Sequence, residues 1–364
     1  MFLNNTWYVA AWSNEVGRTL LERTICDEPV ALYRKEDGTA VAIGNRCPHR
    51  FAPLHLGKLL GDIVQCPYHG LQFDETGGCV FNPNGDGKIP KKARVPSYQL
   101  VEKHDLIWLW MGEDKFADES KVPDFSCLAD KDFRSVGGVF EVEANYSLLI
   151  DNLIDLTHAQ FLHENTVGND AIAGGKFELV ENGTTVYSNL WCPDGPLPNA
   201  WQPAFGGNYQ KNVDQWLYMR WDAPGHMLLD VGVTPLGRPR GEGAWVYGTD
   251  ILTPKDDKTT YYFWGISQNY AVDDAAQDDA WRQAIYTAFE CEDKPLLEAQ
   301  SKMMRGKSFE DLEPVLLSSD VGPVRCRRVL QKLIETQGQP DPALLSLAEL
   351  RNAATDQGRI EPVV

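Results

Sequence analysis

The sequence predicts an α+β protein with two domains, a small antiparallel β domain followed by a larger antiparallel sheet wrapped around a long helix. Three observations support this fold class. Short apolar runs alternate with turn residues over the first third of the chain, longer strand-like runs recur after residue 176, and a long segment with few helix breakers lies near the C-terminus. We place the domains at residues 1–136 and 137–364.

Turn residues at short intervals mark the strands of the first domain. A charged turn at residues 35–38 separates the first two apolar runs, and the segment 82–87 consists only of loop-forming residues. The last run is the most apolar and closes the domain before a charged connector. The predicted strands are residues 30–33, 40–43, 71–73, 79–81 and 106–111.

The second domain combines a helical pattern with longer strands. Residues 145–163 show a helical period, and residues 278–304 read as one long helix to which Pro295 is the single objection. Strands recur between the two helices, which is the order expected of a sheet packed around a helix. The predicted strands are residues 176–181, 215–221, 226–233, 245–252 and 260–266.

Composition and charge exclude several classes of protein. The chain is 43% hydrophobic, which is enough for a sizeable core, and its net charge of −18 disfavours binding to nucleic acid or anionic membranes. The run 106–111 is far too short to cross a bilayer, and the N-terminus lacks a basic and apolar leader. We therefore expect a cytoplasmic protein, in which paired Cys and His residues indicate metal binding before disulfides.

Two loops each offer one cysteine and one histidine. Cys47-Pro-His49 is followed, after a gap of sixteen residues, by Cys66-Pro-Tyr-His69. Two thiolates and two imidazoles could bind one tetrahedral zinc ion, or one [2Fe–2S] cluster with both cysteines on one iron and both histidines on the other. Zinc fingers usually have a His-His or Cys-Cys second pair, so the two mixed pairs favour the cluster. Such a centre transfers single electrons and needs a reaction site elsewhere in the chain.

A second set of polar residues lies in the predicted helix 145–163. Asn152, Asp155 and His158 are spaced three apart and would share one helix face, whereas His163 follows His158 by five residues. A bulge or a helix end near Phe161 would bring both imidazoles to one metal. Two histidines and one carboxylate form the triad that holds non-haem Fe(II). Spacing alone leaves the carboxylate open among Asp273, Asp274, Asp278, Asp279, Glu290, Glu292 and Asp293.

The chain resembles the oxygenase components of Rieske non-haem iron oxygenases, in particular the short type represented by the vanillate and dicamba O-demethylases. The two cluster loops, residues 5–10 and residues 145–163 contribute to this resemblance, which is weak across residues 165–245. It implies a helix-grip-like second domain. It also implies that Cys47, His49, Cys66 and His69 bind a Rieske [2Fe–2S] cluster, and that His158, His163 and Asp293 bind a mononuclear Fe(II).

The same resemblance implies roles for two neighbouring side chains. Asp155 would link the iron-bound histidine to a cluster-bound histidine of a neighbouring subunit, and a carboxylate between two imidazoles is a sound way to orient both. The protein would then be a homotrimer with a head-to-tail arrangement. Asn152 would lie near the iron without being a firm ligand.

The implied reaction uses O₂ and electrons from NAD(P)H, supplied by a ferredoxin or a flavin reductase. Family members of about this length include many O- and N-dealkylases, so the resemblance implies oxidative demethylation or another dealkylation of a substituted aromatic compound, xenobiotics included. A ring-hydroxylating dioxygenase would share every metal ligand and is the first alternative. A non-catalytic Rieske electron carrier, or a small-molecule carrier with a similar cavity, would not need the second metal site.

One departure from the family pattern bears on the substrate. The segment Gly248-Thr249-Asp250 resembles a family segment that reads Gly-Thr-His, in which the histidine would help to hold a substrate carboxylate. An ionised Asp250 facing the pocket would instead repel a carboxylate. We expect a neutral substrate with an N–H or O–H donor, such as an anilide or a phenol ether.

Overall fold

The computed structural model describes residues 1–163, 172 and 174–336, which fall into two compact units. The smaller unit comprises residues 2–122 and 253–257, and the larger unit comprises residue 1 and the other described residues from 123 to 336. The α+β fold class predicted from the sequence is confirmed. The boundary between residues 136 and 137 stays a prediction.

Three antiparallel sheets make up the smaller unit. Their strand orders are β1-β11-β10, β2-β3-β4-β9 and β5-β6-β7-β8. All five strands predicted here are present within about two residues, while six others were not predicted, namely β1, β2, β5, β6, β9 and β10. The strands are β1 (Thr6–Trp12), β2 (Leu21–Ile25), β3 (Glu28–Arg34), β4 (Ala40–Gly44), β5 (Lys58–Leu60), β6 (Ile63–Gln65), β7 (Gln72–Phe73), β8 (Cys79–Phe81), β9 (Ser97–Tyr98), β10 (Leu100–Lys103) and β11 (Leu106–Met111).

Strand β3 separates two hydrophobic cores because successive side chains of a strand point to opposite faces. Val30 and Leu32 pack in one core with residues of β1 and β11. Ala31 and Tyr33 pack in the other core, which also contains both cysteines of the cluster motif. The second core therefore anchors the two Cys/His loops to the sheet.

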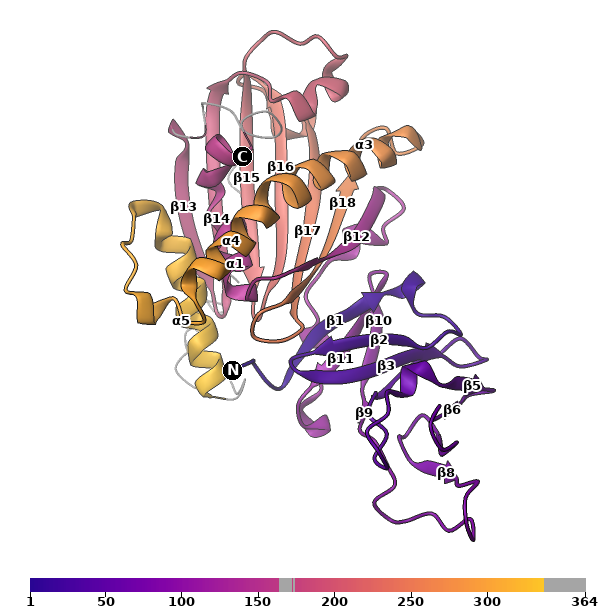
Figure 1. Cartoon of the computed structure of the whole chain (residues 1–364). Coiled ribbons are helices and arrows are strands. Elements are labelled where there is room, and N and C mark those ends of the chain that lie inside the picture. The colour runs from indigo at the N-terminus through magenta and orange to yellow at the C-terminus, as the bar shows by residue number, and fades with distance from the viewer. Residues whose placement is uncertain (164–171, 173, 337–364) are drawn as a thin grey trace, which may run out of the picture. The chain divides into compact units, whose positions relative to one another are not determined.

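The larger unit is built on one antiparallel sheet of seven strands. Its order is β12-β18-β17-β16-β15-β14-β13, so six strands follow one another as a meander and β12 adds to the free edge of β18 (Figure 1). The sheet curves around the helices on one face. The strands are β12 (Arg134–Val142), β13 (Lys176–Asn182), β14 (Thr185–Gly195), β15 (Val213–Asp222), β16 (His226–Pro235), β17 (Ala244–Pro254) and β18 (Thr260–Gln268).

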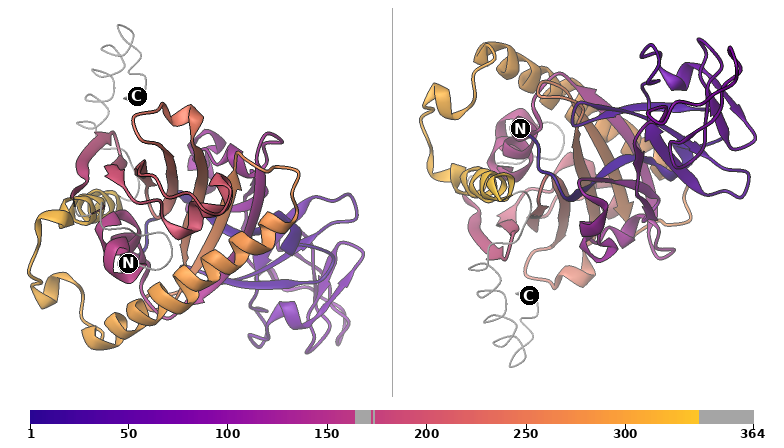
Figure 2. Two further views of the ribbon diagram at one scale, coloured as in Figure 1. Left: turned by 90° about the horizontal axis from the view of Figure 1, so that it is seen from above. Right: turned by 90° about the horizontal axis from the view of Figure 1, so that it is seen from below.

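A long continuous helix lies across one face of this sheet (Figures 1 and 2). It consists of α3 (Ala276–Ile285), a π-helical segment (Tyr286–Asp293) and α4 (Lys294–Met304), which confirms the predicted helix 278–304. Pro295 is tolerated because it falls in the first turn of α4, directly after the π-helical segment. Helix α5 (Val321–Glu335) follows. Within the described residues, no helix combines the length and the apolar character needed to span a membrane.

The prediction of one helix over residues 145–163 is wrong in its middle. Helix α1 (Tyr146–Ile154) ends at Asp155, whose φ of −90° and ψ of 88° are not helical. The Thr157 N–H donates to the Asp155 carboxylate, so Asp155 caps a new 3₁₀ turn (Leu156–His158) that leads into the short helix α2 (Ala159–Leu162). Aspartate favours such cap positions over helix interiors, which explains the break.

Candidate metal centres and substrate cavity

The two cluster loops have matching main-chain geometry. In each loop the cysteine N–H donates to the carbonyl five residues ahead, and the N–H four residues ahead donates back to the cysteine carbonyl. The residue that donates back has a positive φ in both loops, 59° in the first and 73° in the second. These bonds join Cys47 to Ala52 and Phe51, and Cys66 to Leu71 and Gly70.

The four candidate cluster ligands gather in two pairs. Cys47 and Cys66 are buried, and their thiols lie within hydrogen-bonding reach of each other. Burial, followed by the neighbouring thiol, raises the pKa of Cys47 to about 11. Two buried thiols of this kind lose their protons when they bind a metal, because only the thiolate coordinates the ion. His49 and His69 form the more exposed pair, with ring centroids 4.6 Å apart.

This pairing fits an iron–sulfur cluster better than a single zinc ion. A tetrahedral zinc ion would draw all four ligand atoms to one point. In the described part of the chain, however, the only three potential ligand atoms within 4.8 Å of one another belong to the second metal site. Two thiols at the buried end and two imidazoles at the outer end match the two unlike irons of a Rieske cluster.

The second site brings together His158, His163 and Asp293, the three residues that resemblance assigns to the mononuclear iron. Their ligand atoms lie within 4.8 Å of one another. The Nε2 atom of His163 lies 3.2 Å from one carboxylate oxygen of Asp293, and that of His158 lies 3.7 Å from the other. Ligands bound at right angles, about 2.1 Å from an ion, would be about 3 Å apart. The helix end expected near Phe161 is present, because α2 stops at Leu162.

The hydrogen bonds of the two imidazoles orient both rings for a bound cation. Nδ1 of His163 donates to Glu292 (2.7 Å), and Nδ1 of His158 donates to the backbone carbonyl of Asp155 (2.5 Å). Each neutral ring then turns an Nε2 lone pair towards Asp293. Burial lowers the pKa of His163, but Asp293 and Glu292 more than reverse this effect and raise it above its usual value. Three converging electron-pair donors fit a bound Fe(II).

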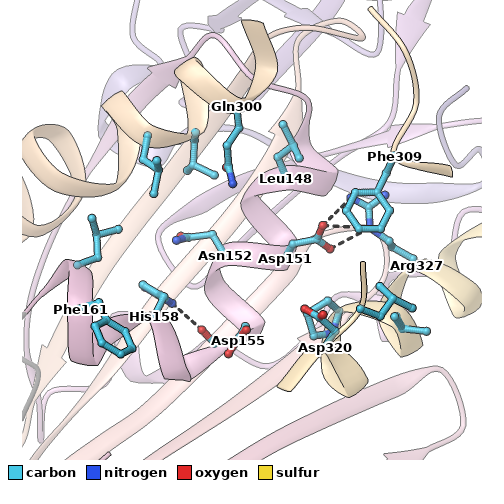
Figure 3. Close-up of a pocket in the computed structure, with 16 residues that line it drawn as sticks. Leu148, Asp151, Asn152, Asp155, His158, Phe161, Gln300, Phe309, Asp320 and Arg327 are labelled. Carbon is cyan, nitrogen blue, oxygen red and sulfur yellow. Dashed lines mark hydrogen bonds and ion pairs between the residues drawn. The ribbon is translucent and has the colours of Figure 1, made fainter. Parts of the chain in front are cut away.

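Asn152 and Asp155 lie on and just after α1, near His158 of this triad (Figure 3). The Asn152 amide donates to the Asp293 carboxylate at 2.9 Å, so it contacts a metal ligand. Asp155 holds His158 through its backbone carbonyl, whereas its carboxylate accepts hydrogen bonds from Thr157. The sequence-based interpretation had the carboxylate contact this imidazole, and in the structure the main chain makes that contact instead.

An apolar cavity of about 160 Å³ lies between the sheet and the long helix, with the triad in its wall. Residues of α3 and of the π-helical segment close it on the helix side, and Trp201 and Trp281 add aromatic surface. Asp250 also lines the cavity. The sheet contributes Leu217, Met219, Leu229, Val231, Val246 and Ile266.

Asp250 is buried and accepts a hydrogen bond of 2.5 Å from the hydroxyl of Tyr262. Burial raises the pKa of Asp250 to about 6, while the hydrogen bond from Tyr262 lowers it and the charge of Asp293 raises it further. Besides Asp293 of the triad, the cavity therefore contains a second carboxyl group, which has a raised pKa and already accepts one hydrogen bond. Asp250 therefore lines the cavity, and this is the position from which we expect it to repel a substrate carboxylate.

A groove of about 500 Å³ lies outside the triad and is lined by side chains of α1, α4 and α5 (Figure 3). Asp155 and Asn152 lie in its wall, and Asp151 forms an ion pair with Arg327 on its far side. His158 lines both this groove and the apolar cavity. His158 therefore borders the groove on one side and the apolar cavity on the other.

Sequence reasoning did not find Tyr262, Trp281 or the role of Glu292 as a partner of His163. Tyr262 is one of several aromatic residues in an apolar strand, and nothing in that pattern indicates which of them faces the cavity. Glu292 stood among the candidate iron ligands, but its carboxylate bonds to the Nδ1 side of the ring, away from the metal position. Only the three-dimensional arrangement distinguishes these roles.

Paired cluster loops in a β domain and an Fe(II) triad beneath a helix-covered sheet define the oxygenase component of a two-metal oxygenase. Comparison with protein families agrees. Residues 6–99 match the Rieske [2Fe–2S] domain, and residues 142–336 match the vanillate O-demethylase oxygenase C-terminal domain. The chain belongs to this family of Rieske oxygenase components, and its cofactors are the Rieske [2Fe–2S] cluster and a non-haem iron.

Individual relatives extend over nearly the whole chain. The oxygenase component of dicamba O-demethylase from Stenotrophomonas maltophilia is 39% identical over 91% of this chain and 98% of its own length. The oxygenase component of chloroacetanilide N-alkylformylase from Rhizorhabdus wittichii is 37% identical over 95% and 99%. The crystal structure of dicamba monooxygenase bound to 3,6-dichlorosalicylic acid superposes with a TM-score of 0.88, at 38% identity and with 92% and 98% of the two chains covered.

Proposed function

We propose that this protein removes an O- or N-alkyl group, most simply a methyl group, from a neutral single-ring aromatic compound by monooxygenation. The observation that supports this most strongly is the apolar cavity with the iron triad in its wall and a carboxyl group, Asp250, beside it. The similar proteins named above are an O-demethylase and an N-alkylformylase, which supports an alkyl group on oxygen or nitrogen as the target.

The size and lining of the cavity support a small aromatic substrate. An apolar protein cavity of about 150 Å³ holds one benzene molecule, and the cavity here is about 160 Å³. The rings of Trp201, Trp281, Phe289 and Tyr262 line it among aliphatic side chains. Aromatic pairs prefer edge and offset contacts, which these rings can offer to a planar substrate.

The polar groups of the cavity favour a neutral substrate that carries a hydrogen-bond donor. Asp250 is held by Tyr262 and accepts hydrogen bonds when ionised. A substrate N–H or O–H would add a second donor to this carboxylate. A substrate carboxylate would bring two negative charges together in a poorly solvated site, which costs on the order of a few kcal/mol. An anilide or a phenol ether fits these surroundings better than a benzoate.

The iron, once bound, would supply the activation of O₂. In the overall reaction an aryl methyl ether, O₂, two electrons and two protons give a phenol, formaldehyde and water. Asp293, held by the Asn152 amide, and the two histidines would fix the metal against the cavity wall. The aliphatic lining would exclude bulk water, and Asp250 would orient the ring so that its alkyl group points to the metal.

Electrons would come from a separate reductase or ferredoxin and would reach the iron through the Rieske cluster of a neighbouring subunit in a homotrimer. The groove beside His158 supports this route, because it opens the iron ligand to the outside without crossing the substrate cavity. Asp155 lies in this groove, where its carbonyl holds His158 and its carboxylate could face an incoming imidazole.

A substrate screen with a generic ferredoxin and reductase pair tests this proposal. Matched pairs of aryl methyl ethers and anilides, with and without a carboxylate, are supplied with NADH, and formaldehyde or another aldehyde is measured. We expect aldehyde release to be greatest from the neutral members, and Asp250→His to shift preference towards the carboxylate members. Preference of the wild type for carboxylates, unchanged by Asp250→His, would reject the substrate class. A ring diol without aldehyde would favour the dioxygenase alternative.

A further inference from the structure

Glu292 contacts a metal ligand without being in a position to bind the metal itself. Its carboxylate accepts the Nδ1–H of His163 at 2.7 Å, on the side of the ring opposite the Nε2 atom that faces Asp293. The His163 side chain is 6% exposed and that of Glu292 is 23% exposed, so little water competes for this bond. A carboxylate bonded to the outer nitrogen of a histidine ligand fixes its tautomer and raises its basicity.

The two iron-binding histidines differ in this respect. The outer nitrogen of His158 donates to a neutral group, the backbone carbonyl of Asp155, whereas that of His163 donates to an anion. The side chain of His158 is also more exposed, at 24% against 6%. His163 is therefore expected to be the stronger donor of the pair.

The π-helical segment explains how adjacent residues can serve the same site. Successive side chains of an α-helix point about 100° apart, so neighbours seldom reach a common target. The wider turn of the segment 286–293 reduces this angle, and it ends at Asp293. Asp293 then faces both Nε2 atoms, while Glu292 reaches behind the ring of His163.

Charge balance gives a second reason to expect an effect on metal binding. Fe(II) and Asp293 alone would leave a net positive charge in a largely buried site. The carboxylate of Glu292 offsets part of this charge from the far side of the His163 ring. Glu290, in the same segment, is used differently, because it pairs with Lys294 at 2.6 Å. It therefore offers a matched control carboxylate that is paired with a lysine instead of a metal-site histidine.

We propose that Glu292 is a positioning residue of the iron site: its hydrogen bond from Nδ1 of His163 holds that imidazole with Nε2 towards the metal and adds negative charge behind it. The Glu292 carboxylate thereby strengthens Fe(II) binding without coordinating the ion. This inference goes beyond the proposed reaction, because it holds for any substrate and any product.

The test compares Fe(II) affinity in variants of the full-length protein with the cluster intact. Fe(II) is titrated anaerobically against a competing chelator, and the visible spectrum of the cluster is recorded in the same sample. We expect Glu292→Gln, which can still accept the hydrogen bond but lacks the charge, to weaken Fe(II) binding about tenfold. Glu292→Ala, which loses both, should weaken it up to about a hundredfold.

The control and the other outcomes separate this inference from the proposed function. Glu290→Gln should bind Fe(II) within about twofold of the wild type, and all variants should keep the cluster spectrum and the melting temperature of the iron-free protein. Unchanged Fe(II) affinity in both Glu292 variants would overturn the inference, as would an equal loss in Glu290→Gln. A wild-type protein that binds no Fe(II) would instead overturn the proposed oxygenase function.

Discussion

The carboxyl group of Asp250 is a titratable group in the wall of the cavity, and its titration should change substrate preference. Burial raises its pKa to about 6, so the group is mostly neutral at pH 5 and mostly ionised at pH 7.5. The neutral form tolerates a substrate carboxylate and the ionised form repels it. Preference for a neutral ligand over its carboxylate analogue should therefore increase as the pH rises through about 6.

We expect this preference to grow at least about tenfold between pH 5 and pH 7.5, since tenfold corresponds to about 1.4 kcal/mol and a like-charge pair at 4 Å costs more than this near a protein surface. The preference is measured as the ratio of the dissociation constants of the carboxylate ligand and its neutral analogue for the iron-free protein at each pH. Asp250→Asn, which cannot ionise, should give a flat profile. An equally steep profile in Asp250→Asn would assign the effect to another group.

The cluster ligands give a second prediction for single residues. Cys66→Ser or His69→Ala should abolish the visible and EPR spectra of the Rieske cluster, because a lost ligand leaves one iron incompletely coordinated. Cys79→Ser is the control, because Cys79 packs beside the second core and is not paired with either loop cysteine in the structure. Full spectra in both ligand variants, or zinc without sulfide in the wild type, would contradict the assignment.

Among the structural elements, the interrupted helix and the π-helical segment determine the iron site. The cap at Asp155 turns the chain after α1 so that His158 lies on a 3₁₀ turn and His163 at the end of α2. The π-helical segment ends at Asp293 on the opposite wall. Each candidate ligand therefore stands where a regular helix is broken, so the geometry of the candidate site depends on these irregularities as much as on residue type.

Loss of this triad should be separable from loss of the cluster. His158→Ala or Asp293→Ala is expected to leave the Rieske spectrum unchanged and to remove the mononuclear iron and all turnover. Metal analysis should then give about two irons per chain, where the wild type gives about three. Three irons in either variant, or an altered cluster spectrum, would show that these residues do not form an independent site.

The same elements show what sequence could and could not predict. The spacing of Cys47, His49, Cys66 and His69 pointed to the cluster because each loop holds its ligands locally. The pairing of Asp293 with two histidines more than a hundred residues away came from family resemblance, since spacing left seven acids open. Strand β14 was missed although Val186, Ser188, Leu190 and Cys192 alternate as buried residues. The break at Asp155 was missed because a helical period continues across it.

For the whole molecule, the open question is how electrons reach the iron. The proposed route crosses between subunits at Asp155, so Asp155→Asn should leave both metals in place and lower turnover at least about tenfold. Asparagine can keep the cap on Thr157 through its side-chain oxygen. Asp320→Asn, in the same groove, is the control and should stay near wild-type activity. Full activity in Asp155→Asn would reject the relay.

Mixed oligomers provide a second test of electron transfer between subunits. A Cys66→Ser subunit lacks the cluster and a His158→Ala subunit lacks the iron, so each homo-oligomer should be inactive. Co-expressed with separate affinity tags and purified as a mixture, the two should regain part of the wild-type turnover if electrons cross between chains. No activity in a verified mixed oligomer would place the electron route within one chain.

The central claim is that this protein, loaded with both metals, dealkylates a neutral aromatic compound, and a single turnover tests it most directly. The protein is reduced chemically, freed of excess reductant, and given a neutral aryl methyl ether or anilide and O₂ without any reductase. The cluster and the iron each supply one electron, so we expect up to about one aldehyde and one dealkylated product per protomer. A hydroxylated ring without aldehyde, or no product from a fully metal-loaded protein across the neutral panel, would contradict the account.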